Sequence, residues 1–121
     1  MNVSKWHWMI ALCGFLLMLV APAQAHHSVA SEYNVKQLTP MTGVLEKLEL
    51  VKPHPWMFVD VKAADGSVQT WQLEFSLRWR PSSMVIGQSY KMIVMPARYT
   101  KQKAFIVELT FPDGTKFSRA S

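Results

Sequence analysis

The stretch Trp56–Phe75, WMFVDVKAADGSVQTWQLEF, decides the fold of this chain. Apolar and polar side chains alternate along 56–62 and again along 68–75, which is the period of a β-strand with one buried face. Asp65 and Gly66 lie between the two runs, and this pair tolerates the positive φ values of a tight turn. The stretch therefore predicts a β-hairpin. Its expected buried side chains are Met57, Val59, Val61, Trp71, Leu73 and Phe75.

A further strand is predicted before the hairpin, at Met41–Leu50 (MTGVLEKLEL), and Gly43 near its start permits a bend or bulge. The alternation assigns to its buried face the residues Val44, Leu48 and Leu50. The next segment, Val51–Pro55 (VKPHP), ends the strand because its two prolines donate no backbone hydrogen bond. His54 is therefore expected in a turn.

After the hairpin, residues 76–86 lose the alternation and predict a loop with at most one helical turn. Residues 88–97 predict a strand that is apolar on both faces, and residues 98–103 a polar connection. Residues 104–111 predict a last strand, before a short tail. Its expected buried face consists of Phe105, Val107, Leu109 and Phe111.

The predicted order of elements is three strands, an irregular connection and two more strands. This is the order of the all-β, five-stranded Greek-key barrel known as the OB fold. We therefore expect one OB-like β-barrel domain at residues 41–121. The alternative is a short β-sandwich, which differs in how the first strand pairs with the last.

The N-terminal segment has the layout of a secretory signal peptide at residues 1–25. Lys5 precedes an uncharged run, Trp8–Val20, and small residues follow two apart at Ala23 and Ala25. The alternative is an uncleaved membrane anchor, but a spanning helix needs about 20 apolar residues, more than this run provides. The expected mature protein is periplasmic or secreted, has no stable membrane anchor, and begins with an extended N-terminal arm at residues 26–40.

Cleavage would leave 96 residues without a cysteine, because Cys13 is the single cysteine of the chain. Stability must then come from the apolar core or a bound ligand. The net charge of +5 would fall to +4 with the loss of Lys5. Outside the cytoplasm, such a basic surface is expected to meet anionic membranes, glycans or acidic proteins and no nucleic acid; ordinary solubility is the alternative explanation.

Three histidines, His26, His27 and His54, form the first candidate site. A mature N-terminal histidine offers its amino nitrogen and Nδ1 to one metal ion, and another imidazole completes a nitrogen-rich set that favours Cu(II). Copper is therefore the expected cofactor of this site. The alternative is that the first two histidines are solvated and that the His54 ring bonds a backbone carbonyl.

The second candidate site is the ligand-binding loop Arg78-Trp79-Arg80, in the connection after the third strand. Two guanidinium groups beside an indole suit an anionic or aromatic ligand, such as an envelope polymer or a protein partner. The alternative is that Trp79 plugs one end of the barrel.

The sequence contains no nucleophile motif, no phosphate-binding glycine loop and no His-Glu-x-x-His. Asp60 and Glu74 are isolated acids that we expect to be solvated or paired with Lys62, and Trp56 and Trp71 are expected in the core. An enzyme is therefore the weaker class.

The chain resembles a family of small exported bacterial proteins of unknown function, whose precursors carry an Ala-His-His-Ser junction, a Thr-Gly-x-Val strand start and a Pro-His-x-Trp turn. The matching stretches are Ala25-His26-His27-Ser28, Thr42-Gly43-Val44-Leu45, Pro53-His54-Pro55-Trp56, Ala64-Asp65-Gly66 and 109–114. The resemblance implies export and the barrel fold, and it implies no activity.

The sequence thus predicts an exported small binding protein with copper at its mature N-terminus. The second hypothesis is a metal-free interaction module of the cell envelope. The third is a copper oxidase or oxygenase that resembles other enzymes with a mature N-terminal histidine.

Overall fold

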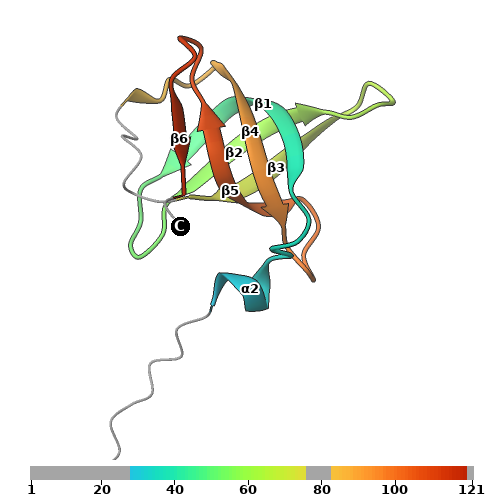
Figure 1. Cartoon of the computed structure of the whole chain (residues 1–121). Coiled ribbons are helices and arrows are strands. Elements are labelled where there is room, and N and C mark those ends of the chain that lie inside the picture. The colour runs from blue at the N-terminus through green and yellow to red at the C-terminus, as the bar shows by residue number, and fades with distance from the viewer. Residues whose placement is uncertain (1–27, 76–82, 120–121) are drawn as a thin grey trace, which may run out of the picture.

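The computed structural model describes residues 28–75 and 83–119, and the predicted signal peptide, His26, His27 and the loop Arg78-Trp79-Arg80 lie outside them. Within the described residues, one short helix precedes six strands (Figure 1). The elements are α2 (Val29–Glu32), β1 (Thr39–Glu49), β2 (Trp56–Lys62), β3 (Val68–Glu74), β4 (Ser89–Pro96), β5 (Lys103–Thr110) and β6 (Lys116–Ser118). The bounds of the first five strands agree with the predicted ones to within a few residues.

The strands form a sheet in the order β3-β2-β1-β4-β5-β6, and a further pairing joins β3 to β5. This extra pairing is parallel, whereas the neighbouring strands of the sheet pair antiparallel. It closes the first five strands into a barrel. This confirms the predicted OB-like fold and excludes the short β-sandwich. The tail that the sequence left unassigned forms β6 on the edge of β5.

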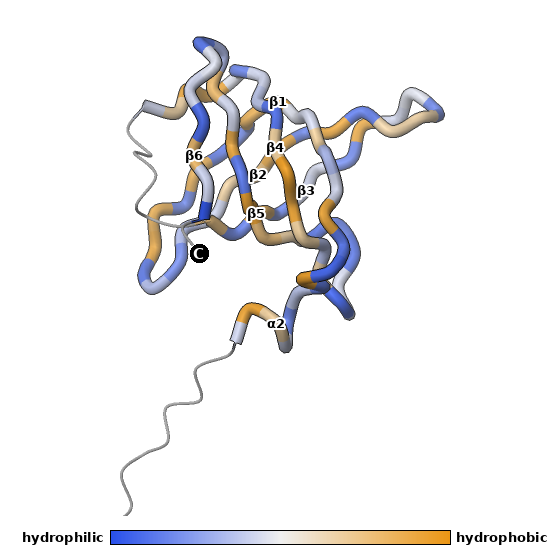
Figure 2. The backbone as a smooth tube through the Cα atoms, viewed as in Figure 1, coloured by the Kyte–Doolittle hydropathy of each residue, from blue (hydrophilic) through white to orange (hydrophobic). Residues whose placement is uncertain are grey.

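The interior of the barrel is filled by apolar side chains from all five strands. The alternation seen in the sequence places Met57, Val59 and Leu73 there with no exposed surface. β4 is hydrophobic over most of its length (Figure 2), because Val94 faces the interior while Met95 packs into a second cluster outside it. The prediction of a strand that is apolar on both faces is therefore confirmed.

The predicted buried face of β1 is wrong at Val44 and also at Leu50, which lies beyond the end of the strand and is 56% exposed. Leu45 is fully buried, whereas Val44 is about one third exposed. Leu45 pairs with Val59 and Lys47 with Phe58, so Glu46 is an extra residue that forms a β-bulge. The bulge reverses the alternation, which is why Leu48, two positions beyond Glu46, also packs against the core.

The predicted buried face of β5 is also wrong, because a second β-bulge interrupts the alternation. Ile93 pairs with Glu108 and Val94 with Ile106, which leaves Val107 without a partner in β4. Ile106 and Leu109 therefore both face the interior, while Phe105 belongs to the outer cluster. One uninterrupted face from Phe105 to Phe111 does not exist.

The segment before β1 is docked against the barrel and contains α2. The Ser28 side chain caps this helix by accepting a hydrogen bond from the Ser31 N–H. Tyr33 follows the helix, forms a bridge with Ala97 and is buried with Met95 and Phe105 in the outer cluster. Among the described residues, no helix has the length and apolarity to traverse a bilayer.

The bulge at Glu46 predicts opposite outcomes for two adjacent substitutions. Leu45→Ala should lower the free energy of unfolding by about 2–5 kcal/mol, because it leaves a cavity in the core. Val44→Ala should cost about 1 kcal/mol or less, since that side chain is partly exposed. Urea unfolding followed by tryptophan fluorescence measures both. A larger loss for Val44→Ala would contradict this register.

Candidate functional site

Glu74 is the one charged residue that is buried in the part of the chain described here. It ends β3, where its backbone pairs with Trp56 of β2 on one side and with Phe105 of β5 on the other. Its neighbours in sequence, Leu73 and Phe75, have no exposed surface and face the interior, so the carboxylate points out of the barrel. Because the carboxylate is nevertheless buried, something outside the barrel must cover it.

The cover consists of two side chains that bond the two carboxylate oxygens. The Tyr33 hydroxyl donates a hydrogen bond to Oε2, and His54 Nδ1 lies 2.9 Å from Oε1. Tyr33 comes from the segment after α2, and His54 comes from the turn between β1 and β2. One carboxylate thus ties together three parts of the chain, and no buried side-chain polar atom of the described residues lacks a partner.

Burial raises the pKa of the Tyr33 phenol above its ordinary range, and the hydrogen bond to Glu74 adds to this effect. The phenol therefore stays neutral at physiological pH and acts as a donor to the carboxylate. Its ring also packs edge to face on Phe105, with 5.6 Å between ring centroids. These contacts hold the hydroxyl in one orientation.

Lys103 supplies a positive charge beside Tyr33 and Trp56. Its ammonium group pairs with Glu32 of α2. The same group lies 5.2 Å from the centre of the Trp56 ring and 5.8 Å from that of Tyr33. These are cation–π distances, and a partly buried cation gains from them. Both Trp56 and Trp71 were expected in the core. Trp71 does pack against the core, but Trp56 does not.

The turn that carries His54 is anchored through the next residue, Pro55. Pro55 is fully buried, and its carbonyl accepts a hydrogen bond of 3.1 Å from the Phe75 N–H. The His54 side chain itself is 46% exposed. Its position is therefore set by the turn and by Glu74, while its outer edge remains open to a ligand.

The bond to Glu74 decides what His54 can do chemically. If Nδ1 carries the proton and donates it to the carboxylate, the lone pair of the neutral imidazole lies on Nε2. Carboxylate–histidine pairs of this kind orient imidazoles that bind metals, and they raise the basicity of the ligating nitrogen. His54 can therefore act as a metal ligand or as a proton acceptor at Nε2.

Of the residues predicted to form sites, the structure places only His54. It brings His54 to a carboxylate, not to the backbone carbonyl considered as the alternative. The described residues contain no cluster of three or more His, Cys, Asp or Glu side chains that could hold a metal ion. A complete metal site would therefore need ligands from outside the described part of the chain.

The sequence patterns did not indicate a role for Tyr33, and the prediction for Glu74 was wrong. Glu74 was expected to be solvated or paired with Lys62, but it is buried between Tyr33 and His54. Asp60 instead bonds Thr70, whose hydroxyl lies 2.6 Å from a carboxylate oxygen. Periodicity correctly places Glu74 on the outer face of β3. It cannot show that Tyr33 and His54, from other parts of the chain, lie over the carboxylate.

The raised pKa of Tyr33 predicts a loss of stability at high pH. The folded state holds the phenolic proton more tightly than the unfolded state, whose tyrosines titrate near about 10. The contribution of the protonated Tyr33 phenol to the free energy of unfolding is complete below about pH 10. Above that pH it falls by about 1.4 kcal/mol per pH unit. Tyr33→Phe should therefore cost about 1.5–3 kcal/mol at pH 8 and progressively less at higher pH.

Urea unfolding of both proteins between pH 8 and 11 measures this difference. Tyr99→Phe is the matched control, because Tyr99 is 91% exposed. A constant difference between the wild-type protein and Tyr33→Phe across this range would contradict the assignment.

Comparison with known proteins yields one match. No curated protein and no solved structure matches the chain. A family model described as a family of unknown function (DUF6152) matches residues 15–105, which is most of the chain and includes Tyr33, His54, Glu74 and Lys103. The chain therefore belongs to the DUF6152 family of unknown function.

Proposed function

We propose that this protein is an exported, periplasmic binding protein that takes up Cu(II) at its mature N-terminus. In this proposal His26 contributes its amino nitrogen and ring Nδ1, and His54 contributes Nε2 as the remaining imidazole ligand. His27 is the alternative source of that imidazole. Nitrogen donors of this kind in a tetragonal arrangement favour Cu(II) over the other divalent ions. Metal storage, delivery or sensing would follow.

The observation that carries the proposal is the 2.9 Å contact between His54 Nδ1 and the buried Glu74 carboxylate. It leaves Nε2 as the ligating atom and orients the ring. A purely structural histidine in a proline-rich turn needs no buried carboxylate. The partial exposure of the ring also gives a metal ion access to it.

The position of the segment before β1 also supports the proposal. Tyr33 and His54 bond the two oxygens of one carboxylate, so the chain passes close to His54 when it reaches Tyr33. His26 lies seven positions before Tyr33, and four of the six residues between them are in α2. With about 1.5 Å per helical residue and about 3.3 Å per extended residue, this tether reaches about 16 Å. A return of His26 toward His54 is therefore compatible with the length of the chain.

The proposal predicts that a free amino group at His26 is essential. Titration of the protein that begins at His26 with Cu(II), in competition with a chelator, gives the reference affinity. Placing Gly-Ser-Gly-Ser before His26 moves the amine away while it keeps every histidine, and we expect an affinity at least about 100-fold lower, since one chelate ring is lost. An unchanged affinity would show that the N-terminal chelate does not exist.

The role of Glu74 is tested by Glu74→Gln. A glutamine amide donates to Nδ1 and thereby moves the imidazole proton to Nε2, so Cu(II) affinity should fall about 10- to 100-fold while the volume is kept. Asp60→Asn is the matched control, because it alters another carboxylate on the same hairpin and should leave the affinity unchanged. Equal affinities for Glu74→Gln and the wild-type protein would remove His54 from the site and leave His27 as the third donor.

A further inference from the structure

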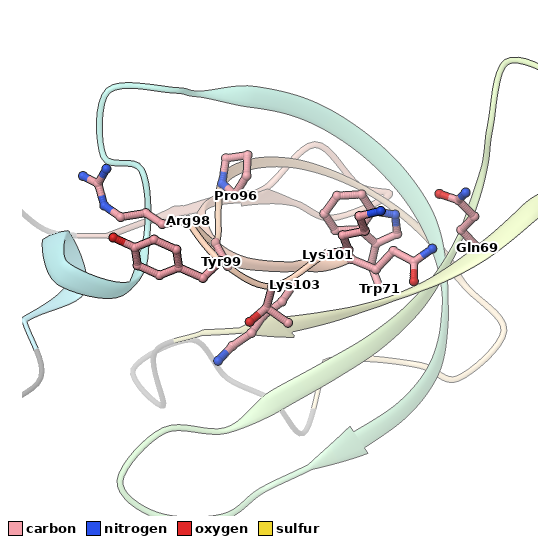
Figure 3. Close-up of a pocket in the computed structure, with 10 residues that line it drawn as sticks. Gln69, Trp71, Pro96, Arg98, Tyr99, Lys101 and Lys103 are labelled. Carbon is pink, nitrogen blue, oxygen red and sulfur yellow. The ribbon is translucent and has the colours of Figure 1, made fainter.

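An open groove of about 540 Å³ lies where the connection between β4 and β5 passes β3. Figure 3 shows Arg98 and Tyr99 at the end of the groove near α2, and Gln69 and Trp71 of β3 at the other end. Its volume falls within the range of about 300–1,000 Å³ that is typical of small-molecule sites. Neither the copper proposal nor the Glu74 carboxylate involves this groove.

The lining of the groove combines three chemistries. Trp71 and Tyr99 provide aromatic rings, Arg98 and Lys101 provide positive charge, and Gln69 provides an amide, while no acidic residue lines the groove. The other lysine, Lys103, already pairs with Glu32. Within the described residues, neither Arg98 nor Lys101 has an acidic partner.

Among the large hydrophobic side chains of the described residues, that of Tyr99 is the most exposed, with 91% of its surface accessible. An aromatic ring at the tip of a connection contributes nothing to the core. Beside two uncompensated cations and a half-buried indole, it offers an apolar face on which a flat ligand ring can stack. Trp71 packs against the barrel core, which fixes the second aromatic wall.

The groove is preformed because hydrogen bonds hold the connection at several points. The Gln102 carbonyl accepts the Gln72 N–H at 2.9 Å, and Gln102 adopts a positive φ of 53°. Arg98 Nε donates to the Ala30 carbonyl at 3.1 Å, which ties the other end to α2. A ligand would therefore find its contacts already in place, so that little ordering cost opposes binding.

We propose that this groove binds an acidic oligosaccharide. Sugar rings present apolar C–H faces that stack on Tyr99 and Trp71, and their hydroxyl groups exchange hydrogen bonds with the amide of Gln69. Uronate carboxylates pair with Arg98 and Lys101, and the planar guanidinium suits a carboxylate in particular. The site gives the protein a ligand of the cell envelope that is independent of any metal.

Isothermal titration with hexagalacturonate tests the proposal, in a chelator so that no metal contributes. The fully methyl-esterified hexamer is the neutral control ligand. We expect the acidic hexamer to bind at least about tenfold more tightly than the ester, because only its carboxylates attract Arg98 and Lys101. Tyr99→Ala and Lys101→Ala should each weaken binding about fivefold or more, since stacking and charge are lost separately.

Both substituted residues are exposed, so the fold should survive the changes. Lys116→Ala is the matched control, because it removes one exposed positive charge from β6, outside the groove. Its affinity should stay within about twofold of the wild-type value. Three results would overturn the proposal: no binding of the acidic hexamer at millimolar concentration, equal binding of the ester, or an equal loss for Lys116→Ala and Lys101→Ala.

Discussion

The parallel pairing of β3 with β5 is the constraint on which the rest of the molecule depends. Three residue pairs, Gln72–Lys103, Leu73–Ala104 and Glu74–Phe105, turn a sheet with two edges into a closed barrel. The same pairs place Glu74, Lys103 and Phe105 along one seam, outside the barrel interior. Glu74, with its partners Tyr33 and His54, lies on this seam. The groove between β3 and the β4–β5 connection begins beside it, so both candidate sites depend on how the barrel closes.

Burying a carboxylate on this seam costs free energy, and the surrounding contacts offset that cost. Tyr33 and His54 satisfy its oxygens, and the Lys103 ammonium lies close to the rings of Tyr33 and Trp56. A hydrophobic residue at this position would serve the stability of the barrel about as well. What the carboxylate adds is orientation: it defines the rotation of the His54 ring and the position of the segment that precedes β1.

Most of the fold could be predicted from local patterns. The hairpin, the proline-rich turn and the order of strands all follow from alternation and turn residues between Met41 and Phe111. The errors came from interactions that act at a distance. The bulge at Glu46 depends on the pairing with β2, and the burial of Glu74 depends on Tyr33, 41 positions earlier in the chain. The contact between His54 and Glu74 could not be predicted, because an isolated acid on an outer strand face ordinarily meets water.

The docking of α2 has a consequence for the order of events during synthesis. The Glu32 contact spans 71 positions to Lys103, and the Ala30 contact spans 68 positions to Arg98. The segment that contains α2 is made early, but the residues that it contacts, Arg98 and Lys103, are made late. Until β5 has been made and joined to β3, the leading segment lacks the surface against which it packs. Docking of the segment before β1 is therefore a late step of folding, because it needs the completed barrel.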